Sequence, residues 1–253
     1  MSDTCDVSGC VVLVTGASSG LGQAMARALG EAGARVVLMA RRREQLDSLA
    51  GEIRQGGGEA AVVAADLARV EAIPGYAAAA AAPFGPVGVL INAAGVNLRQ
   101  PVDEVTIADW RLTIDLHLTA PFFLARELVP GMRRQRWGRI INIASMQSFR
   151  AMPDSLPYGA AKGGVVQMTR AMTEAWARDG ITCNAIAPGF FPTDLTRPVF
   201  EDADRVDELA RRTPAGRNGR LEDLAGITRF LASPASDYIT GQTICIDGGF
   251  SAC

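Results

Sequence analysis

The chain has 253 residues, of which 48% are hydrophobic and 21% charged, as is typical of one globular α/β domain with a substantial core. Its formal net charge of −2 gives no general attraction to nucleic acid or to anionic membranes. The densest basic run, residues 133–139, follows an apolar helical stretch, and we interpret it as a solvated helix end. We therefore expect neither nucleic acid nor membrane as a partner.

Targeting signals and metal motifs are not predicted. The N-terminus has no charged segment followed by an apolar one, and no apolar run has the length of a membrane span. The five cysteines form no C-x-x-C pair, which favours a reducing cytoplasm over a disulfide framework. His117 is the only histidine, so a two-histidine metal site within one chain is excluded, and we expect no metal.

Short apolar runs alternate with longer helical stretches along the whole chain. The helical stretches include residues 22–33 and 43–57. Buried strands are predicted at residues 10–16, 34–40, 59–66, 87–93, 138–145, 181–188 and 241–249. This alternation predicts a parallel sheet with helices on both faces, that is, a single Rossmann-type, doubly wound α/β domain over residues 1–253. In such a sheet, ligands bind beyond the carboxyl ends of the strands.

The turn after the first predicted strand is rich in glycine. It reads TGASSGLG, and Gly16, Gly20 and Gly22 lie where the strand passes into a helix. Without side chains, the backbone can turn tightly and approach a pyrophosphate, to which the helix N-terminus offers free N–H groups. The spacing differs from the commoner G-x-G-x-x-G, but its place in an alternating α/β chain favours dinucleotide binding.

The end of the second predicted strand bears on the choice between NADP and NAD. NAD-specific sites usually have Asp or Glu there, whereas this chain has Ala40 followed by Arg41. An arginine can pair with a 2′-phosphate, and Ser18 could add a hydroxyl. The alternative is a solvated arginine cluster at the start of a helix. We expect NADP(H) as the cofactor, with NAD(H) not excluded.

Two polar residues end the third and fourth predicted strands. Asp66 either accepts a hydrogen bond from the adenine amino group or caps the next helix. Asn92, in the stretch NAAG, is expected to tie neighbouring strands together more than to do chemistry.

Tyr158 and Lys162 are four residues apart in LPYGAAKGGV. If they share a helix, they lie on the same face, and the ammonium favours the phenolate and lowers the pKa of the tyrosine. This spacing alone is common by chance.

Taken together, the ordered motifs resemble the short-chain dehydrogenase/reductase family over essentially the whole chain. They are TGASSGLG, NAAG, Ser145 after the fifth predicted strand, YGAAK, APGFFPT at residues 187–193 and the terminal IDGG. The resemblance implies an NAD(P)-dependent oxidoreductase acting on an alcohol or a ketone.

The resemblance also implies a role for each matching residue. Tyr158 would be the general acid or base, Lys162 would lower its pKa and hold the nicotinamide ribose, and Ser145 would bind the substrate oxygen. Thr193 would bind the carboxamide or cap the substrate lid, or both. The residues expected at the cofactor are Gly16, Ser18, Gly20, Leu21, Gly22, Arg41, Asp66, Leu67, Asn92, Ala93, Tyr158, Lys162, Pro188, Gly189 and Thr193.

One position departs from the family. His117 stands where the family usually has an asparagine that holds a water linking the lysine to solvent. A neutral imidazole can donate and accept, so His117 either replaces this relay as a fourth catalytic residue or is a satisfied core histidine.

The substrate is suggested by the resemblance alone, which is greatest to gluconate 5-dehydrogenase-like members. A sugar acid carries a carboxylate that Arg99 or Arg150 could bind, although both could instead serve subunit contacts or solvent. A 3-oxoacyl thioester reductase or broad ketone reductase is the alternative, and a catalytically silent NADP-binding protein is a third. Residues 190–212 are expected to form a substrate lid, and the family implies a homotetramer or homodimer.

Overall fold

The computed structural model describes residues 5–252 and has one parallel sheet. The strands are β1 (Val11–Thr15), β2 (Arg35–Ala40), β3 (Glu59–Ala64), β4 (Val89–Asn92), β5 (Gly138–Ile143), β6 (Ile181–Pro188) and β7 (Thr243–Ile246). Their order across the sheet is β3-β2-β1-β4-β5-β6-β7, and every neighbouring pair is parallel. The predicted doubly wound α/β fold is confirmed, and the order in which strands are added to the sheet reverses between β1 and β4, where such folds bind ligands.

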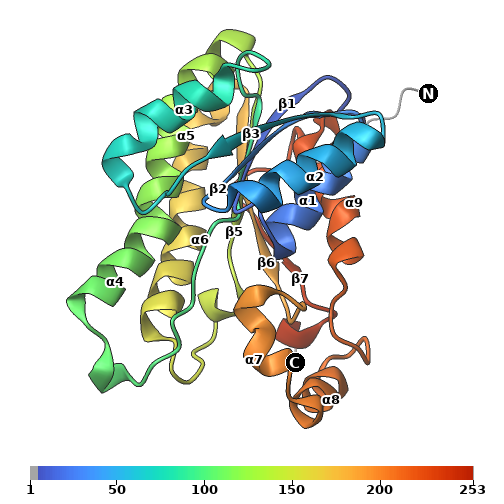
Figure 1. Cartoon of the computed structure of the whole chain (residues 1–253). Coiled ribbons are helices and arrows are strands. Elements are labelled where there is room, and N and C mark those ends of the chain that lie inside the picture. The colour runs from blue at the N-terminus through green and yellow to red at the C-terminus, as the bar shows by residue number, and fades with distance from the viewer. Residues whose placement is uncertain (1–4, 253) are drawn as a thin grey trace.

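Helices cover both faces of the sheet. They are α1 (Gly20–Glu31), α2 (Arg43–Gln55), α3 (Ile73–Ala81), α4 (Ile107–Ile114), α5 (Ala120–Gln135), α6 (Leu156–Trp176), α7 (Arg197–Phe200), α8 (Ala203–Arg212) and α9 (Ala225–Ala232). In Figure 1, α1, α2 and α9 lie on one face, α3, α5 and α6 lie on the other, and α7 and α8 project from one end. No helix among residues 5–252 combines the length and apolar character of a membrane span.

Two apolar clusters pack against the two faces of the sheet. Alternate residues of β1 divide between them, since Val12 and Val14 belong to the cluster under α1 and α2, and Leu13 belongs to the cluster under α3 and α5. This division follows from the two-residue repeat of a strand, and it explains why the predicted strands read as continuous apolar runs.

The strand ends differ from the sequence prediction where polar residues begin. β3 ends at Ala64 rather than at Asp66, and β7 ends at Ile246, before Asp247 and two glycines. Asp247 accepts hydrogen bonds from the backbone N–H groups of Gly249 and Ser251, which turns the chain away from the sheet.

Arg139 corrects the interpretation of the basic run. Arg133 and Arg134 lie in the last turn of α5, as expected of a solvated helix end, but Arg139 is in β5 and only 1% exposed. Its guanidinium donates to the carbonyls of Ser233 and Gly138, at 3.1 and 3.0 Å, and to the carboxylate of Asp237. The last residue of the run therefore fixes the amino end of a central strand.

Candidate active site

The glycine turn brings the ends of β1 and β4 together beside the switch point of the sheet. Gly16 has φ +67°, and a Cβ atom built there would lie 2.8 Å from the backbone of Ala93. A Cβ at Gly22 would lie 2.5 Å from the carbonyl oxygen of Gly16. Thr15 fixes the approach, because its hydroxyl accepts from the N–H groups of Ala93 and Ala94 at 3.0 and 3.2 Å. Only glycine fits this cradle, as a dinucleotide site requires.

The three arginines after β2 take different positions. Arg41 is exposed directly after β2. Arg42 precedes α2, and its Nη2 atom donates to the hydroxyl oxygens of Ser18 and Ser19 at 3.0 and 2.6 Å. Arg43 faces Asp47 one helical turn on, at 3.4 Å. Sequence reasoning named Arg41 and missed Arg42, because the run of arginines alone does not reveal which side chain turns toward the glycine loop.

The residues at the ends of β3 and β4 have clear structural partners. Asp66 Oδ1 accepts from the N–H of Ala68 at 3.2 Å, so it caps a turn, and its expected contact with adenine stays a prediction. Leu67 is buried in the core beside it. Asn92 donates through its side-chain nitrogen to Asn142 Oδ1 at 2.9 Å, which ties β4 to β5 as expected.

Ser145 begins a short helical turn directly after β5. Its hydroxyl accepts from the N–H of Gln147 at 3.1 Å, and its own N–H donates to the hydroxyl of Ser148 at 3.3 Å. Ser148 in turn donates to the carbonyl of Lys162 at 2.7 Å. These bonds hold the loop that carries Ser145 against the helix that carries Tyr158 and Lys162.

Tyr158 and Lys162 both lie in α6, as predicted, and their pKa values are shifted chiefly by burial. The Lys162 ammonium donates to the carbonyl of Ile143 at 2.5 Å and lies 5.5 Å from the centre of the Tyr158 ring. Burial lowers the pKa of Lys162 to about 7. Burial also raises the pKa of Tyr158, while a hydrogen bond with Ser145 and the positive charge of Arg99 oppose this rise. The expected lowering of the tyrosine pKa is therefore not found, because burial outweighs the two opposing causes.

His117 lies in a π-helical turn, Asp115–Thr119, between α4 and α5. Its Nε2 atom is 2.8 Å from the carbonyl oxygen and 3.1 Å from the nitrogen of Val96. Its Nδ1 atom is buried and has no hydrogen-bond partner among residues 5–252. The ring meets that of Tyr158 edge to face, with 5.3 Å between centroids. Burial and the nearby charge of Lys162 lower its pKa to about 3, so the imidazole is neutral.

Pro188 is the last residue of β6, and Gly189 begins the segment that follows. A Cβ at Gly189 would lie 2.8 Å from the Cα of Asp247, so the chain passes close to the end of β7. Thr193 lies against the glycine turn, since a Cβ at Gly20 would be 3.1 Å from its Cβ. The Thr193 hydroxyl accepts from the N–H of Thr196 at 3.4 Å, so its capping role is present.

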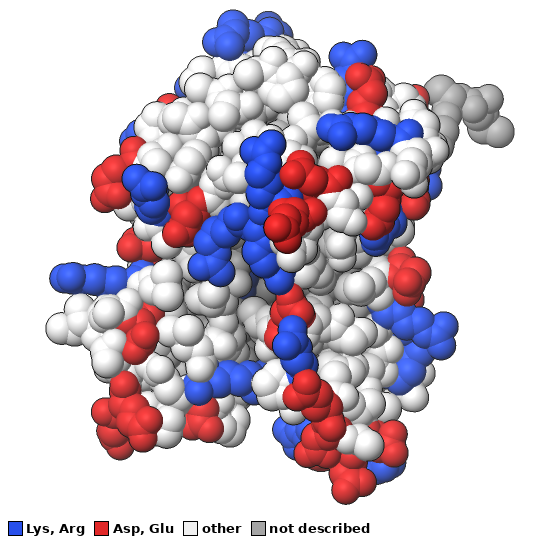
Figure 2. Space-filling model, viewed as in Figure 1, with Lys and Arg blue, Asp and Glu red and all other residues white. Residues whose placement is uncertain are grey.

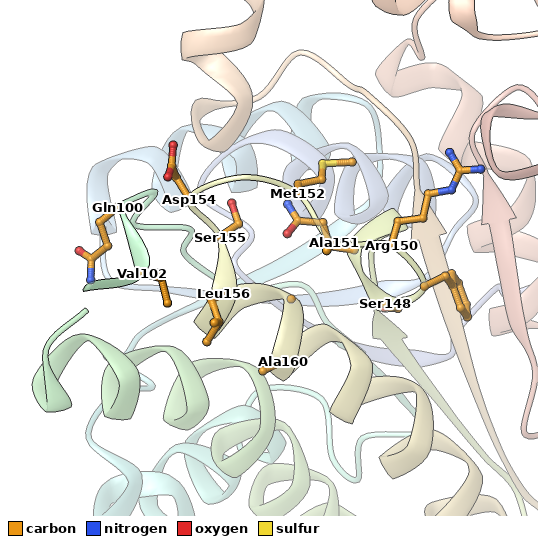
Figure 3. Close-up of a pocket in the computed structure, with 13 residues that line it drawn as sticks. Gln100, Val102, Ser148, Arg150, Ala151, Met152, Asp154, Ser155, Leu156 and Ala160 are labelled. Atoms are coloured by element: carbon orange, nitrogen blue, oxygen red, sulfur yellow. The ribbon is translucent and has the colours of Figure 1, made fainter. Parts of the chain in front are cut away.

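The two arginines expected at the substrate have different surroundings. The backbone of Arg99 is in the left-handed region, with φ +44°, and the charge of its side chain acts on Tyr158. The guanidinium of Arg150 lies 5.6 Å from the ring centre of Phe250. Arg150 lines one end of a cavity of about 580 Å³, and its side chain extends away from Gln100 at the other end (Figure 3).

Comparisons with known proteins agree with this geometry. The family described as enoyl-(acyl carrier protein) reductase matches residues 16–251. Gluconate 5-dehydrogenase of Gluconobacter oxydans is 38% identical over 98% of this chain and 97% of its own length. The 3-oxoacyl-[acyl-carrier-protein] reductase of Synechocystis is 38% identical over 94% of this chain and 96% of its own.

A solved structure is similar over the same length. The gluconate 5-dehydrogenase of Burkholderia cenocepacia in complex with NADP and tartrate has a TM-score of 0.94 and 38% identity, covering 99% of this chain and 98% of that one. The chain belongs to the short-chain dehydrogenase/reductase family. It is an NAD(P)-dependent oxidoreductase that acts on CH–OH groups and the corresponding carbonyls.

Proposed function

We propose that the chain interconverts a secondary alcohol and a ketone in a sugar acid of the gluconate type, with NADP(H) as its cofactor. The observation that carries the proposal is the hydrogen bond between Tyr158 and Ser145. The positive charge of Arg99 also acts on Tyr158. A positive charge beside the proton donor favours an anionic substrate. The curated relatives and solved neighbours named for gluconate support this class, and the neighbour that contains NADP supports the cofactor.

The residues present fit a dinucleotide. The cradle at Gly16 and Gly22, which a Cβ would fill, would receive the pyrophosphate, and Ser18 with Arg41 would receive the 2′-phosphate. Lys162 would hold the nicotinamide ribose, and Thr193 the carboxamide. When bound, the reduced cofactor supplies the hydride that the protein itself lacks.

The protein's own residues handle the proton and the substrate oxygen. Ser145, fixed by its bonded loop, donates to the substrate oxygen and stabilises negative charge that develops there. Tyr158 donates its hydroxyl proton to the same oxygen in reduction and takes it back in oxidation. Lys162, held by the carbonyl of Ile143, places a positive charge beside the ring.

His117 acts, in this proposal, through one ring nitrogen. The Nε2 atom of His117 is hydrogen-bonded to the backbone carbonyl of Val96. A peptide carbonyl is not a base that can pass a proton onward. A relay through both nitrogens is therefore disfavoured. The unpartnered Nδ1 atom is suited to hold a water at the end of the Lys162 side chain.

A substrate panel tests the proposed function. With NADPH, we expect 5-keto-gluconate to be reduced with a kcat/KM at least about tenfold above that of a 3-oxoacyl thioester, and Arg99→Ala to raise KM for the keto acid. Activity on acyl ketones alone would favour the reductase alternative, which the similarity to the Synechocystis enzyme supports. NADPH binding without turnover of any carbonyl would support the silent alternative.

Assembly, domain boundaries and location complete the proposal. We propose one domain over residues 1–253 with a lid at about 190–212, which α7 and α8 would form. We also propose a homotetramer or homodimer in the cytoplasm. Support for assembly comes from Trp110, Phe122 and Leu156, large apolar side chains of α4, α5 and α6 that are 40%, 38% and 49% exposed. Four described cysteines are free, which suits a reducing compartment.

A further inference from the structure

A buried aromatic ring near the end of the chain meets two arginines from different segments. Phe250 is only 5% exposed. The guanidinium carbon of Arg150, in the loop after β5, lies 5.6 Å from the centre of its ring. The guanidinium carbon of Arg212, the last residue of α8, lies 5.3 Å from the same point. The fold thus brings two cations that are distant in the sequence to one ring.

The backbone on both sides of Phe250 is fixed by one carboxylate. Asp247 accepts hydrogen bonds from the N–H groups of Gly249 and Ser251, at 3.0 and 2.8 Å. The ring of Phe190 meets that of Phe250 edge to face, with 5.3 Å between centroids. Because its backbone and one edge are held in this way, the Phe250 ring is a fixed support for both guanidinium groups.

The same ring lies beside the two segments that border the reacting groups. Phe250 belongs to an apolar cluster with Met146, the residue directly after Ser145. Phe190 packs against this cluster and directly follows Gly189, a residue expected at the cofactor. The two arginines on the ring are therefore next to the loop that carries Ser145 and to the segment that follows β6.

The charge of Arg212 is only weakly compensated within its own helix. Its Nη1 atom is 3.4 Å from Glu208 Oε1, whereas Arg205 pairs with the same carboxylate at 2.5 Å. The Arg212 side chain is 53% exposed, so its pair with Glu208 contributes little. Figure 2 shows acidic and basic side chains mixed over α7 and α8, so this end of the molecule has no single sign of charge. Two arginines held on one ring therefore attract an anion more specifically than the surface around them.

Two guanidinium groups on one ring are suited to a carboxylate. A guanidinium meets a ring through its face, whereas its N–H donors lie in its plane and stay available to an anion. Arginine binds carboxylates through pairs of parallel N–H···O bonds. Because the ring already orders both side chains, binding costs less conformational entropy than it would with free side chains.

We propose that Arg150 and Arg212, held on the ring of Phe250, form a subsite for the carboxylate of the substrate. This inference rests on the proposed function and deepens it, since it names the groups that recognise the acid end of a keto acid. Arg99 then acts on Tyr158 through its charge, whereas the arginine pair holds the other end of the substrate. The subsite selects keto acids over neutral ketones of the same length.

A matched neutral substrate tests the subsite. The methyl ester of 5-keto-gluconate has the same carbon chain as the acid but lacks its charge. With saturating NADPH, Arg212→Gln and Arg150→Gln are each expected to raise KM for the acid at least about fivefold, because a charge-assisted hydrogen bond is lost. KM for the ester should stay within about twofold and kcat for the acid within about threefold, because the lost contact is made equally before and during the reaction.

Arg211→Gln is the matched control for Arg212→Gln. It removes the same charge from the neighbouring residue, and adjacent side chains of a helix point about 100° apart. KM for the acid should therefore stay within about twofold of the parent in this variant.

Phe250→Leu tests the ring itself. Leucine keeps an apolar side chain in the cluster but removes the ring face that both cations meet. KM for the acid should rise at least about threefold, with KM for the ester unchanged. Equal increases for acid and ester would mean that the ring only supports the fold, and its part in the subsite would be wrong.

The subsite and the proposed function fail in different ways. If the parent reduces the keto acid and Arg212→Gln has the same KM as the parent, the subsite is wrong and the proposed function stands. If the parent reduces no keto acid, calorimetry of D-gluconate binding to the NADP⁺ complex still measures the subsite. A Kd that rises at least about fivefold in Arg212→Gln, but not in Arg211→Gln, supports it. Absent binding, or an equal Kd in the parent and Arg212→Gln, contradicts it.

Discussion

Two regions at the same edge of the sheet hold their charged groups by opposite means. Between β5 and α6, Lys162 is 4% exposed, and its ammonium and its carbonyl are bonded to Ile143 and Ser148. Between the glycine turn and the lid segment, Arg42 and Asp194 are about half exposed and share one ion pair. The first region thus fixes its charged group by burial and backbone hydrogen bonds, whereas the second leaves its ion pair open to solvent.

Of changes that disturb the packing in one of the two regions, the largest effect on turnover should come from Gly95 in the buried region. A Cβ at Gly95 would lie 2.3 Å from Cε1 of His117, whose ring contacts that of Tyr158. Gly95→Ala should therefore shift the ring and lower kcat about 100-fold, because misplacement by about 1 Å costs that much. Steady-state kinetics with NADPH and 5-keto-gluconate measure it.

A double variant and a control variant test whether the contact between Gly95 and His117 causes the loss of turnover. Gly95→Ala with His117→Ala should be more active than the two separate losses predict, since the clash is gone. Gly51→Ala, in α2 with open space around the added methyl, should leave kcat unchanged. Additive losses in the double variant would show that the Gly95–His117 contact is not the cause.

Stability should depend on the buried anchor at the other end of β5. Arg139→Met removes the buried guanidinium that donates to the carbonyls of Ser233 and Gly138 and to the carboxylate of Asp237. The free energy of unfolding should fall by about 3 kcal/mol, measured by urea denaturation. A loss below about 1 kcal/mol would place Arg139 with the exposed ion pairs.

The neutral His117 should make stability fall as pH falls. Its pKa is about 3 in the folded chain against 6.5 for a free imidazole, so the unfolded chain binds the extra proton between these values. From pH 7 to pH 5, the parent should lose about 2 kcal/mol more unfolding free energy than His117→Asn does. Urea denaturation at the two pH values measures both losses. If the parent and His117→Asn lose the same unfolding free energy, the imidazole is not held neutral.

The smallest effect on stability should come from the exposed ion pair between Arg197 and Asp194. Arg197 and Asp194 are 61% and 47% exposed, and such pairs contribute roughly 0–1 kcal/mol. Arg197→Gln should change the free energy of unfolding by less than about 1 kcal/mol, by an amount that shrinks further in 1 M salt. A loss comparable to that of Arg139→Met would remove the distinction between the two regions.

The fold was predictable because its signals are local. Apolar runs such as 181–188 are bounded by glycine, proline or polar residues, and β6 has those same bounds. The placement of Tyr158 and Lys162 on one helix followed from their spacing.

The remaining features depend on contacts between distant segments. Which arginine of the run reaches Ser18 depends on where α2 begins, and Arg42 is its N-cap. The π-helical turn at His117 and its fit against Gly95 have no local signal in the sequence. The pKa of Tyr158 depends on burial and on Arg99, from a different loop.

The most direct test of the account removes one hydroxyl. Tyr158→Phe keeps the ring that contacts His117 and deletes the proton donor. With 5-keto-gluconate and NADPH, kcat should fall about 10²–10⁴-fold while the Kd of NADPH stays within about twofold. Turnover equal to that of the parent, with the cofactor bound, would show that another group delivers the proton.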